Sequence, residues 1–451
     1  MPSEGAAMKP FRAFTVIPIL LLLCGAFLCA QDSRPIVKTM RIDGPISPAA
    51  ALYVRRAIGI AEQSKAQALL IHLDTPGGLD DSMRSIIKDI FASEAPVVVY
   101  VAPKGARAAS AGAIITLAAH VAAMAPGTAI GAAHPVQIGG GGGDPEGERP
   151  GQDEVMSQKL EEDAAAYARS IAERRGRNVR WAENAVRRST SSSATEALKQ
   201  NVIDLIAESD EELLRRIDGR KVKLDGGTVT LSTRNARIED IGQSFRERFL
   251  GIIGNPNIVL ILMTIAIYGI IFELSSPGFG FPGIVGAIAL ILALFSFAIL
   301  PVNAAGVVLI VFAAALFIAD VFIPEYGILS IGGVISFVIG ALILFDTPSP
   351  VFRVSIVLII TLAAASFAFV AFAVGAVARA RHAKIVTGSE GMVGELAEAR
   401  TDIDPRGKVF VEGTLWNAVS DSGPIKQGEL VRVVGVDGLT LHVRKETLAN
   451  G

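Results

Sequence analysis

Apolar and polar residues follow two different patterns along the chain, and the change comes near residue 257. Before it, apolar runs of strand length alternate with stretches of helical periodicity. These runs are ALLIHL (68–73), PVVVYV (96–101) and VIDLIA (202–207). Because strands that alternate with helices form layered sheets, residues 31–237 are predicted to fold as an α/β domain.

The second half of the chain contains five longer apolar runs, each near the roughly 20 residues that cross a bilayer as a helix. They predict a membrane domain over 257–378 with five transmembrane helices, the first being the shortest. The runs lie at 257–273, 283–300, 304–323, 328–345 and 354–378. The segments PGFGFPGIVG (277–286) and PEYGILSIGG (324–333) align with each other, which predicts two helical hairpins followed by a single helix.

A short amphipathic stretch joins the two regions. Residues 238–256 are predicted to form this linker, because its apolar side chains recur on one side of a helix and its charges lie elsewhere. The apolar positions are Ile238, Ile241, Phe245, Phe249 and Ile252. The sequence leaves two interpretations open, a helix at the membrane–water interface and a packed linker helix.

The last part of the chain reads as a small β domain. Residues 385–451 alternate short strand patterns with glycine turns, which predicts an all-β, OB-like barrel of five strands. Trp416 is expected to be a core aromatic residue of that barrel rather than a platform for a stacked ligand.

Composition supports a membrane protein and excludes several classes of function. Hydrophobic residues make up 51% of the chain, and the net charge of −2 provides no basic field for nucleic acid. The two cysteines, Cys24 and Cys29, lie in the N-terminal apolar stretch, so the rest of the chain has no cysteine for a disulfide or a metal site. We therefore expect no cofactor, no metal and no nucleic-acid partner.

Charges near the apolar segments predict the topology. Lys9 and Arg12 precede an apolar run, and small residues precede Gln31, which is typical of a signal peptide over residues 1–30. An uncleaved anchor is the alternative. The basic cluster RARHAK (379–384) follows the last run and is expected in the cytoplasm. Five spans then place the α/β domain outside the cytoplasm and the barrel inside it, in a bacterial-type inner or plasma membrane.

The α/β domain also carries a candidate site for serine hydrolysis, which needs a nucleophile, a base and N–H groups that face the developing oxyanion. Ser110 lies among small residues at the expected start of an apolar helix, where a helix N-cap is its alternative role. The turn DTPGG (74–78) follows a strand. Gly77 and Gly78 of this turn, with Ala111 after the serine, are candidate N–H donors.

Two residues compete for the role of the base. His134 titrates near neutral pH, whereas Lys159 would have to be buried in order to lose its proton there. A loop histidine and a surface lysine are the ordinary alternatives. The glycine-rich stretch 139–151 separates the two candidates and is either a linker or a flexible flap. These residues alone do not decide between the two bases.

Several motifs together resemble the long form of the NfeD family of membrane-bound serine proteases. They are DTPGG, GARAASAG, AAMAPGTAIGAAHPV, AAAYARSIAERRGRN and the tryptophan-containing C-terminal barrel. The resemblance covers essentially the whole mature chain, including the order of its domains. It implies an α/β domain of the ClpP/crotonase type, then an α-helical membrane domain and the OB-like barrel.

The resemblance also implies a Ser-Lys dyad endopeptidase that works through an acyl-enzyme. On that pattern Ser110 is the nucleophile and Lys159 the base, with Gly77, Gly78 and Ala111 as oxyanion donors. His134 lies near where the catalytic histidine of ClpP would align, so a Ser-His variant is the alternative. The implied substrates or partners are stomatin-like (SPFH) membrane proteins, cleaved in apolar segments, and a homo-oligomer is expected.

Two further interpretations come from other functional classes. The chain could be a non-catalytic membrane scaffold for stomatin-like assemblies, with the protease fold retained as a binding module. A crotonase-type enzyme acting on acyl thioesters would use the oxyanion donors and would need neither Ser110 nor Lys159.

Overall fold

The computed structural model describes residues 34–134, 152–275, 278, 280–322, 328–345, 352–382 and 389–446. The expected signal peptide (1–30) and the glycine-rich stretch (139–151) lie outside the described residues. The chain divides into two compact units, residues 1–367 and 368–451.

A parallel sheet of six strands forms the core of the α/β domain, in the order β11-β1-β2-β3-β5-β8. The strands are β1 (Ile36–Asp43), β2 (Ala68–Asp74), β3 (Val97–Val101), β5 (Val121–Met124), β8 (Leu205–Ile206) and β11 (Arg237–Asp240). β3 is buried at every position, as expected for a strand covered on both faces. The parallel α/β domain predicted from the sequence is confirmed.

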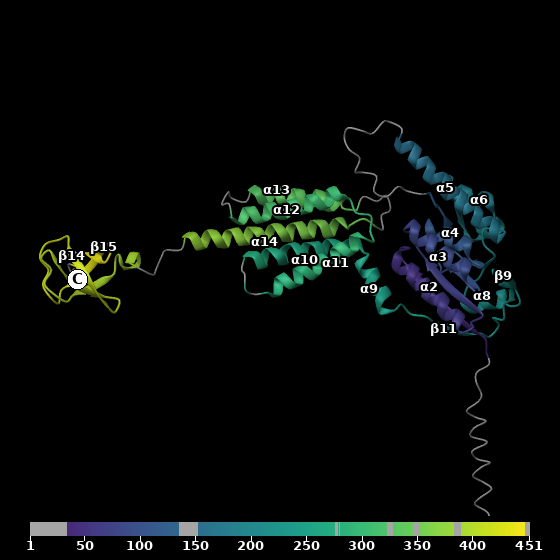
Figure 1. Cartoon of the computed structure of the whole chain (residues 1–451), viewed down its shortest axis with the longest axis horizontal. Helices are drawn as coiled ribbons and strands as arrows, with labels where there is room; N and C mark the ends of the chain where they lie inside the picture. The colour runs from purple at the N-terminus through teal and green to yellow at the C-terminus, as the bar shows by residue number, and fades with distance from the viewer. Residues whose placement is uncertain are drawn as a thin grey trace, which may run out of the picture. The chain divides into compact units, whose positions relative to one another are not determined.

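Helices cover the two faces of this sheet unequally. One face packs against α2 (Pro48–Gln63), α3 (Asp80–Ala92), α4 (Ala111–Ala118), α5 (Gln152–Arg175) and α6 (Val179–Arg187). Helices α2, α3 and α4 lie close to this sheet (Figure 1). The other face is covered by α8 (Asp210–Ile217) and the hairpin of β9 (Lys221–Leu224) and β10 (Gly227–Thr230). The candidate site therefore lies on the thickly covered face, where α3, α4 and α5 meet.

A small second sheet braces the candidate site. It has the order β4-β6-β7, formed by β4 (Arg107–Ala109), β6 (Ala129–Gly131) and β7 (Ser191–Ser193). A capping box of Ser193 and Glu196 then begins α7 (Ala194–Lys199). Because β4 ends immediately before Ser110, this sheet determines where the serine lies.

Two sequence predictions were wrong at the edges of the large sheet. The run VIDLIA (202–207) contributes only the two residues of β8. Residues 238–240, expected to begin the linker helix, instead belong to the edge strand β11 (Arg237–Asp240) beside β1. The hydroxyl of Thr39 on β1 donates to the carboxylate of Asp240, and Lys38 pairs with Glu239. Hydrogen bonding to the open edge of the sheet thus outweighs the helical spacing of apolar residues in this segment. The helix α9 (Phe245–Ile253) begins only at the capping box formed by Ser244 and Glu247.

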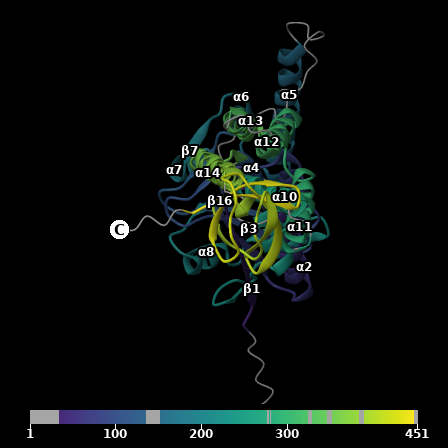
Figure 2. The same ribbon diagram turned by 90° about the vertical axis from the view of Figure 1, so that its left-hand side faces the viewer.

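Five apolar helices follow α9, and the first four form two pairs. They are α10 (Pro256–Ser275), α11 (Phe281–Phe297), α12 (Ala304–Phe322), α13 (Ile328–Ile343) and α14 (Ile356–His382). α10 lies beside α11 and α12 beside α13 (Figures 1 and 2). In the first pair a Cβ atom on Gly269 would lie 2.8 Å from the Cα atom of Gly286, so only glycine allows this approach.

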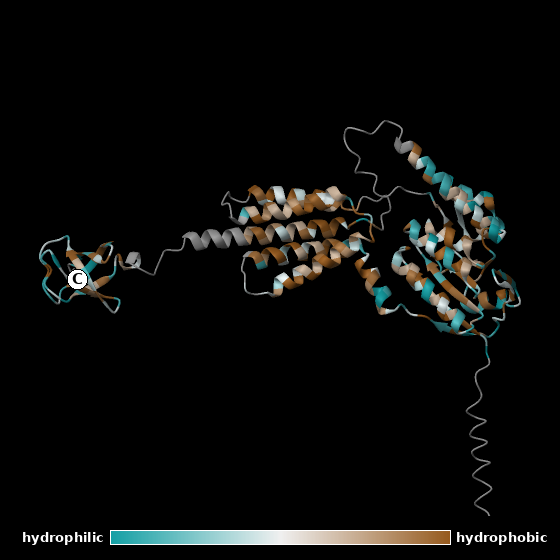
Figure 3. Ribbon diagram, viewed as in Figure 1, coloured by the Kyte–Doolittle hydropathy of each residue, from teal (hydrophilic) through white to brown (hydrophobic). Residues whose placement is uncertain are grey.

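The lengths of these helices correct one expectation. α10, with 20 residues, is longer than α11, α12 and α13, so the first predicted span is not the shortest. Residues 256–274 form a helix long and apolar enough to cross a membrane, and the apolar helices 281–297, 304–320, 328–343 and 356–372 are shorter. Apolar residues predominate along α10–α13 (Figure 3).

The second unit contains the five-stranded barrel that the sequence predicted, closed in the order β12-β13-β14-β16-β15. Its strands are β12 (Leu396–Ala399), β13 (Arg406–Val411), β14 (Thr414–Ser420), β15 (Leu430–Asp437) and β16 (Thr440–Lys445). Trp416 on β14 is partly buried and packs against the barrel core, which agrees with a structural role.

Candidate active site

The turn that follows β2 is held rigidly by its own hydrogen bonds. The buried hydroxyl of Thr75 accepts the N–H of Gly77 at 3.1 Å and lies 3.1 Å from the carbonyl oxygen of the same glycine. The main chain of Ile46 bonds the turn on either side of Gly78. A Cβ atom on Gly78 would lie 2.2 Å from the carbonyl oxygen of Ile46, so this position requires glycine.

Ser110 occupies a strained junction between β4 and α4. Its φ of 52° and ψ of −119° are rare for a residue with a side chain. Its N–H lies 3.1 Å from the carbonyl oxygens of Gly131 and Ala132. Ser110 stands at the N-cap position, but its hydroxyl forms no capping bond within the described helix. A sharp strand-to-helix turn of this kind is how α/β hydrolases present a nucleophile.

The glycine turn and the serine are in direct contact. A Cβ atom on Gly77 would lie 2.6 Å from the Cβ and 3.1 Å from the Oγ atom of Ser110. The N–H of Gly77 is already bonded to Thr75, whereas Ala111 is the first residue of a helix, where N–H groups lack intrahelical acceptors. Gly78 and Ala111 both line the pocket that contains Ser110. These two residues therefore have the better-placed N–H groups.

A pocket of about 190 Å³ lies beside Ser110 and is walled mainly by apolar side chains. Met83, Ile114, Leu160, Ala164 and Val186 form much of this wall. The pocket is suited to an apolar side chain of a peptide.

Arg84 fastens one side of this pocket. Its guanidinium bonds Asp80 on its own helix and Asp163 on α5, both at 2.6 Å, and it stacks 4.4 Å from the ring centre of Tyr167. Burial lowers the pKa of Arg84, but the two carboxylates outweigh burial, so the pKa is raised. Arg84 therefore stays charged and connects α3 to α5 across the pocket.

His134 also lines the pocket, with its ring orientation fixed. Its Nδ1 atom lies 2.9 Å from the carbonyl oxygen of Val186. A carbonyl only accepts hydrogen bonds, so Nδ1 is assigned the hydrogen, and in the neutral ring Nε2 carries the lone pair. A histidine in this tautomer has the form that a general base requires.

Lys159 lies on the exposed face of α5, and the described lining of the pocket does not include it. Its neighbour Leu160 and Asp163, one turn later, do line the pocket. The structure thus brings Ser110 together with Gly77, Gly78, Ala111 and His134, and leaves Lys159 at the margin.

Sequence reasoning missed several residues of this site. Thr75 lies in the motif DTPGG, directly after a buried strand. This position could have identified it, because hydroxyl side chains often form hydrogen bonds that organise turns. Arg84 stands four residues after Asp80 on α3, a spacing that is typical of an ion pair on a helix but gives no indication of the contact with Asp163. Across the described residues, no group of three or more histidine, cysteine or acidic side chains is arranged to hold a metal ion.

Three stretches of the chain match the domains of one protein family. Residues 36–238 match the N-terminal domain of NfeD1b, and residues 257–374 match the NfeD integral membrane domain. Residues 389–445 match the NfeD-like C-terminal, partner-binding domain.

Similar proteins align over nearly the full length. Membrane-bound protease PH1510 of Pyrococcus horikoshii is 38% identical over 98% of this chain and 99% of its own length. Membrane protein NfeD1b of Bacillus subtilis is 27% identical over 97% of this chain and 99% of its own. One similar solved structure is 1510-N of Pyrococcus horikoshii, a membrane-bound stomatin-specific protease. It was solved as a lysine-to-alanine mutant in complex with a substrate peptide, and its sequence is 37% identical to this chain. That likeness covers 48% of this chain and 97% of the other, with a TM-score of 0.43.

Proposed function

The chain belongs to the NfeD family and is a homologue of a membrane-bound protease, and we propose that Ser110 is its catalytic nucleophile. The observation that carries this proposal is the strained backbone of Ser110 directly against the glycine turn and beside an apolar pocket. A serine that merely capped a helix would direct its hydroxyl to the helix N–H groups, and this hydroxyl makes no such bond within the described helix.

The reaction follows from these positions. The Oγ atom of Ser110 attacks the carbonyl carbon of the scissile peptide bond, while a base takes its proton. The N–H groups of Gly78 and Ala111 stabilise the negative charge that develops on the carbonyl oxygen. The base then gives the proton to the departing amine, and water attacks the acyl-enzyme in a second round of the same steps.

We assign the role of the base to Lys159. A lysine accepts a proton near neutral pH only when burial destabilises its charged form. Lys159 precedes the pocket-lining Leu160, so an apolar peptide bound along α5 would cover its ammonium group. In this proposal, substrate binding completes the dyad by excluding water from the first turns of α5.

His134 is the second candidate for the base, and one observation favours it. Its Nδ1 atom is bonded to the carbonyl of Val186, so that in the neutral ring Nε2 is the atom that can accept a proton, in the pocket that contains Ser110. A Ser-His pair would need no burial of Lys159.

We propose stomatin-like membrane proteins as substrates, because 1510-N is described as stomatin-specific and the pocket accepts apolar side chains. We further propose that the α/β domain lies outside the cytoplasm and the barrel inside it, since the basic cluster 379–384 follows the last apolar run of the sequence. A homo-oligomer is part of the same proposal. A non-catalytic scaffold remains the alternative if cleavage does not occur.

The test uses the full chain in nanodiscs with apolar peptides from the C-terminal region of a stomatin-like protein, analysed by mass spectrometry. Ser110→Ala, Lys159→Ala and His134→Ala are compared, with Lys199→Ala as a control for loss of an exposed lysine. We expect cleavage to disappear in the first two and to persist in the other two. Cleavage that survives Lys159→Ala but not His134→Ala would move the base to His134. Absence of cleavage by the folded parent would favour the scaffold.

A further inference from the structure

The linker helix α9 is fixed to the α/β domain through one of its faces. The carboxylate of Glu247 accepts two bonds from Arg56 on α2, at 2.7 and 2.8 Å. Burial raises the pKa of Glu247, but the bonds from Arg56 and Ser244 outweigh it, so the pKa lies below its ordinary value. Arg56 also bonds the carbonyl oxygen of Gly242 at 2.7 Å. The orientation of α9 is therefore set by the domain.

The opposite face of α9 presents large apolar side chains without cover among the described residues. The exposed fractions of Phe245, Phe249 and Ile252 are 82%, 40% and 52%. Their spacing places them in one stripe, and the two phenylalanine rings stack with centres 6.1 Å apart. Arg246 and Arg248 are exposed on the same helix. Aromatic residues accompanied by arginines are typical of helices that lie in a membrane interface.

Chain continuity indicates what covers this stripe. α9 ends at Ile253, and α10, the first helix of the integral membrane domain, begins at Pro256. Two residues separate the helices, so α9 must lie at the depth where the membrane domain begins.

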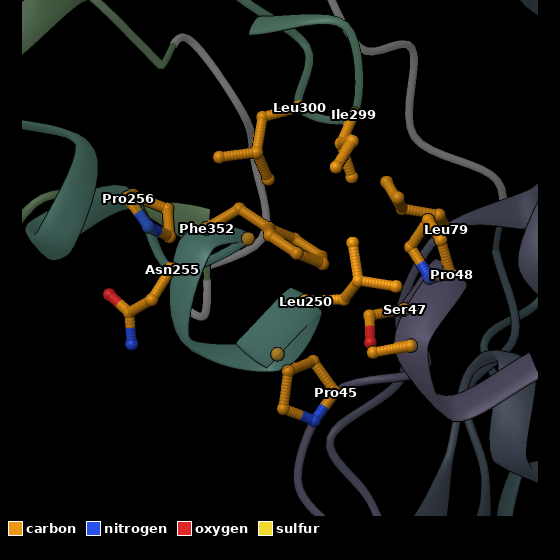
Figure 4. Close-up of a pocket in the computed structure, with 13 residues that line it drawn as sticks. Pro45, Ser47, Pro48, Leu79, Leu250, Asn255, Pro256, Ile299, Leu300 and Phe352 are labelled. Carbon is orange, nitrogen blue, oxygen red and sulfur yellow. The ribbon is translucent and has the colours of Figure 1, made fainter. Parts of the chain in front are cut away.

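A neighbouring apolar pocket occupies the same junction. Leu250 of α9 lines it together with Leu79, Ile299, Leu300 and Phe352 (Figure 4). Ile299 and Leu300 follow α11, and Phe352 precedes α14. The ends of three membrane helices therefore meet α9, which supports a position at the membrane surface.

We propose that α9 is an interfacial anchor that lies in the surface of a phospholipid bilayer. Phe245, Phe249 and Ile252 enter the boundary between headgroups and acyl chains, and Arg246 and Arg248 contact lipid phosphates. Because Arg56 and Glu247 join α9 to α2, the anchor fixes the height of the α/β domain above the bilayer. Neither the assignment of Ser110 nor the nature of the substrate is needed for this proposal.

The experiment uses the full chain in liposomes that contain lipids brominated at shallow or deep acyl positions, which quench nearby tryptophan. Phe245→Trp and Phe249→Trp are compared with Leu198→Trp on α7, whose parent side chain is 40% exposed, as is that of Phe249. Trp181 and Trp416 are present in every variant, so their signal is subtracted with the parent protein.

We expect shallow bromines to quench Trp at 245 and 249 more than deep ones, and neither to quench Trp at 198. Quenching of all three by aqueous acrylamide, with none by lipid, would overturn the proposal and leave α9 in water. The fluorescence of Phe245→Trp could instead be insensitive to lipid and shift to the blue as the protein concentration rises. This result would also overturn the proposal, because it would indicate that a second copy of the chain covers α9. None of these results depends on proteolysis.

Discussion

Ser110 and Lys159, the two members of the proposed dyad, lie in parts of the protein that are packed very differently. The serine is enclosed by the turn after β2, the strand β4 and the buried helix α4, and each of these is bonded to the next through the main chain. The lysine lies on the exposed N-terminal half of α5. The proposed nucleophile is therefore fixed before substrate arrives, while the position of the proposed base can change when substrate binds.

Differences within α5 explain this contrast. Its C-terminal half buries Ala165, Ala168, Ile171 and Ala172 in the core of the domain. Its middle is held by ion pairs at the surface, those of Asp163 with Arg84 and Glu162 with Arg187. Solvent-exposed ion pairs stabilise a helix only weakly, because water and salt screen their attraction. The helix is thus anchored at one end and loosely held where it carries the lysine.

The largest effect is expected from a change on the serine side. Gly78→Ala would place a methyl group 2.2 Å from the carbonyl oxygen of Ile46, so the turn must move and its N–H must leave the oxyanion position. We expect kcat to fall by roughly a hundredfold to a thousandfold, as for loss of an oxyanion donor. Peptide cleavage measures the fall in kcat, and thermal melting measures the effect of the displaced turn on stability. Gly59→Ala, in an open position on α2, is the control and should remain fully active.

A smaller but more specific effect is expected at Thr75, whose hydroxyl organises the same turn. Thr75→Val keeps the shape of the side chain and removes the two hydrogen bonds to Gly77. We expect kcat to fall by about tenfold, in line with roughly 1–3 kcal/mol for unpaired buried groups, while KM changes little. Thr75→Ser should restore most of the activity. Activity that is retained in Thr75→Val and lost in Thr75→Ser would show that methyl packing matters rather than the hydroxyl.

On the lysine side, loss of one ion pair should have a modest effect. Asp163→Asn removes the negative charge that pairs α5 with Arg84 and leaves the ion pair of Arg84 with Asp80 intact. We expect kcat/KM to fall by about twofold to fivefold without a change in melting temperature, as an exposed pair allows. Glu173→Gln, at the anchored end of the helix, serves as the control. A loss as large as that in Gly78→Ala would mean that α5 is as rigid as the serine side.

The smallest effect is expected from pH. Bonding to Arg187 lowers the pKa of Glu162 in the folded protein. The ion pair of Glu162 with Arg187 therefore stabilises the packing of α5 fully at pH values above the ordinary glutamate pKa. This stabilisation is lost as the pH falls through the lowered pKa of Glu162. We expect hydrogen exchange in residues 155–163, corrected for the intrinsic rate, to increase below about pH 4, while residues 111–124 keep their protection. Added salt should act in the same direction. Uniform loss of protection would contradict the contrast.

The sequence places the turn 74–78 and Ser110 near each other, but it does not indicate where Lys159 lies relative to them, for a physical reason. The turn 74–78 follows a strand and Ser110 begins a helix, and such junctions meet at one edge of a parallel sheet. Nothing comparable locates Lys159, because the glycine-rich stretch before α5 provides no register between base and nucleophile. The ion pair between Arg84 and Asp163 joins residues that are far apart in sequence, so the local pattern of the sequence does not predict it.

The same distinction applies to the fold. Buried strands such as 96–101 were predicted because continuous apolar runs have few alternatives. The edge strand β11 was missed, because its strand conformation depends on hydrogen bonding to β1 more than on its own residue composition. The two helical hairpins were visible as a duplicated sequence, whose glycines allow the close approach of the helices.

The backbone conformation of Ser110 has a consequence for protein engineering. A residue at φ 52° and ψ −119° costs of order 1–3 kcal/mol unless it is glycine. Selection of variants for heat resistance alone would therefore favour glycine at position 110 and yield more stable proteins that lack the proposed nucleophile. Thermostable libraries of this protease should be screened for turnover from the first round, because at this position robustness and catalysis compete.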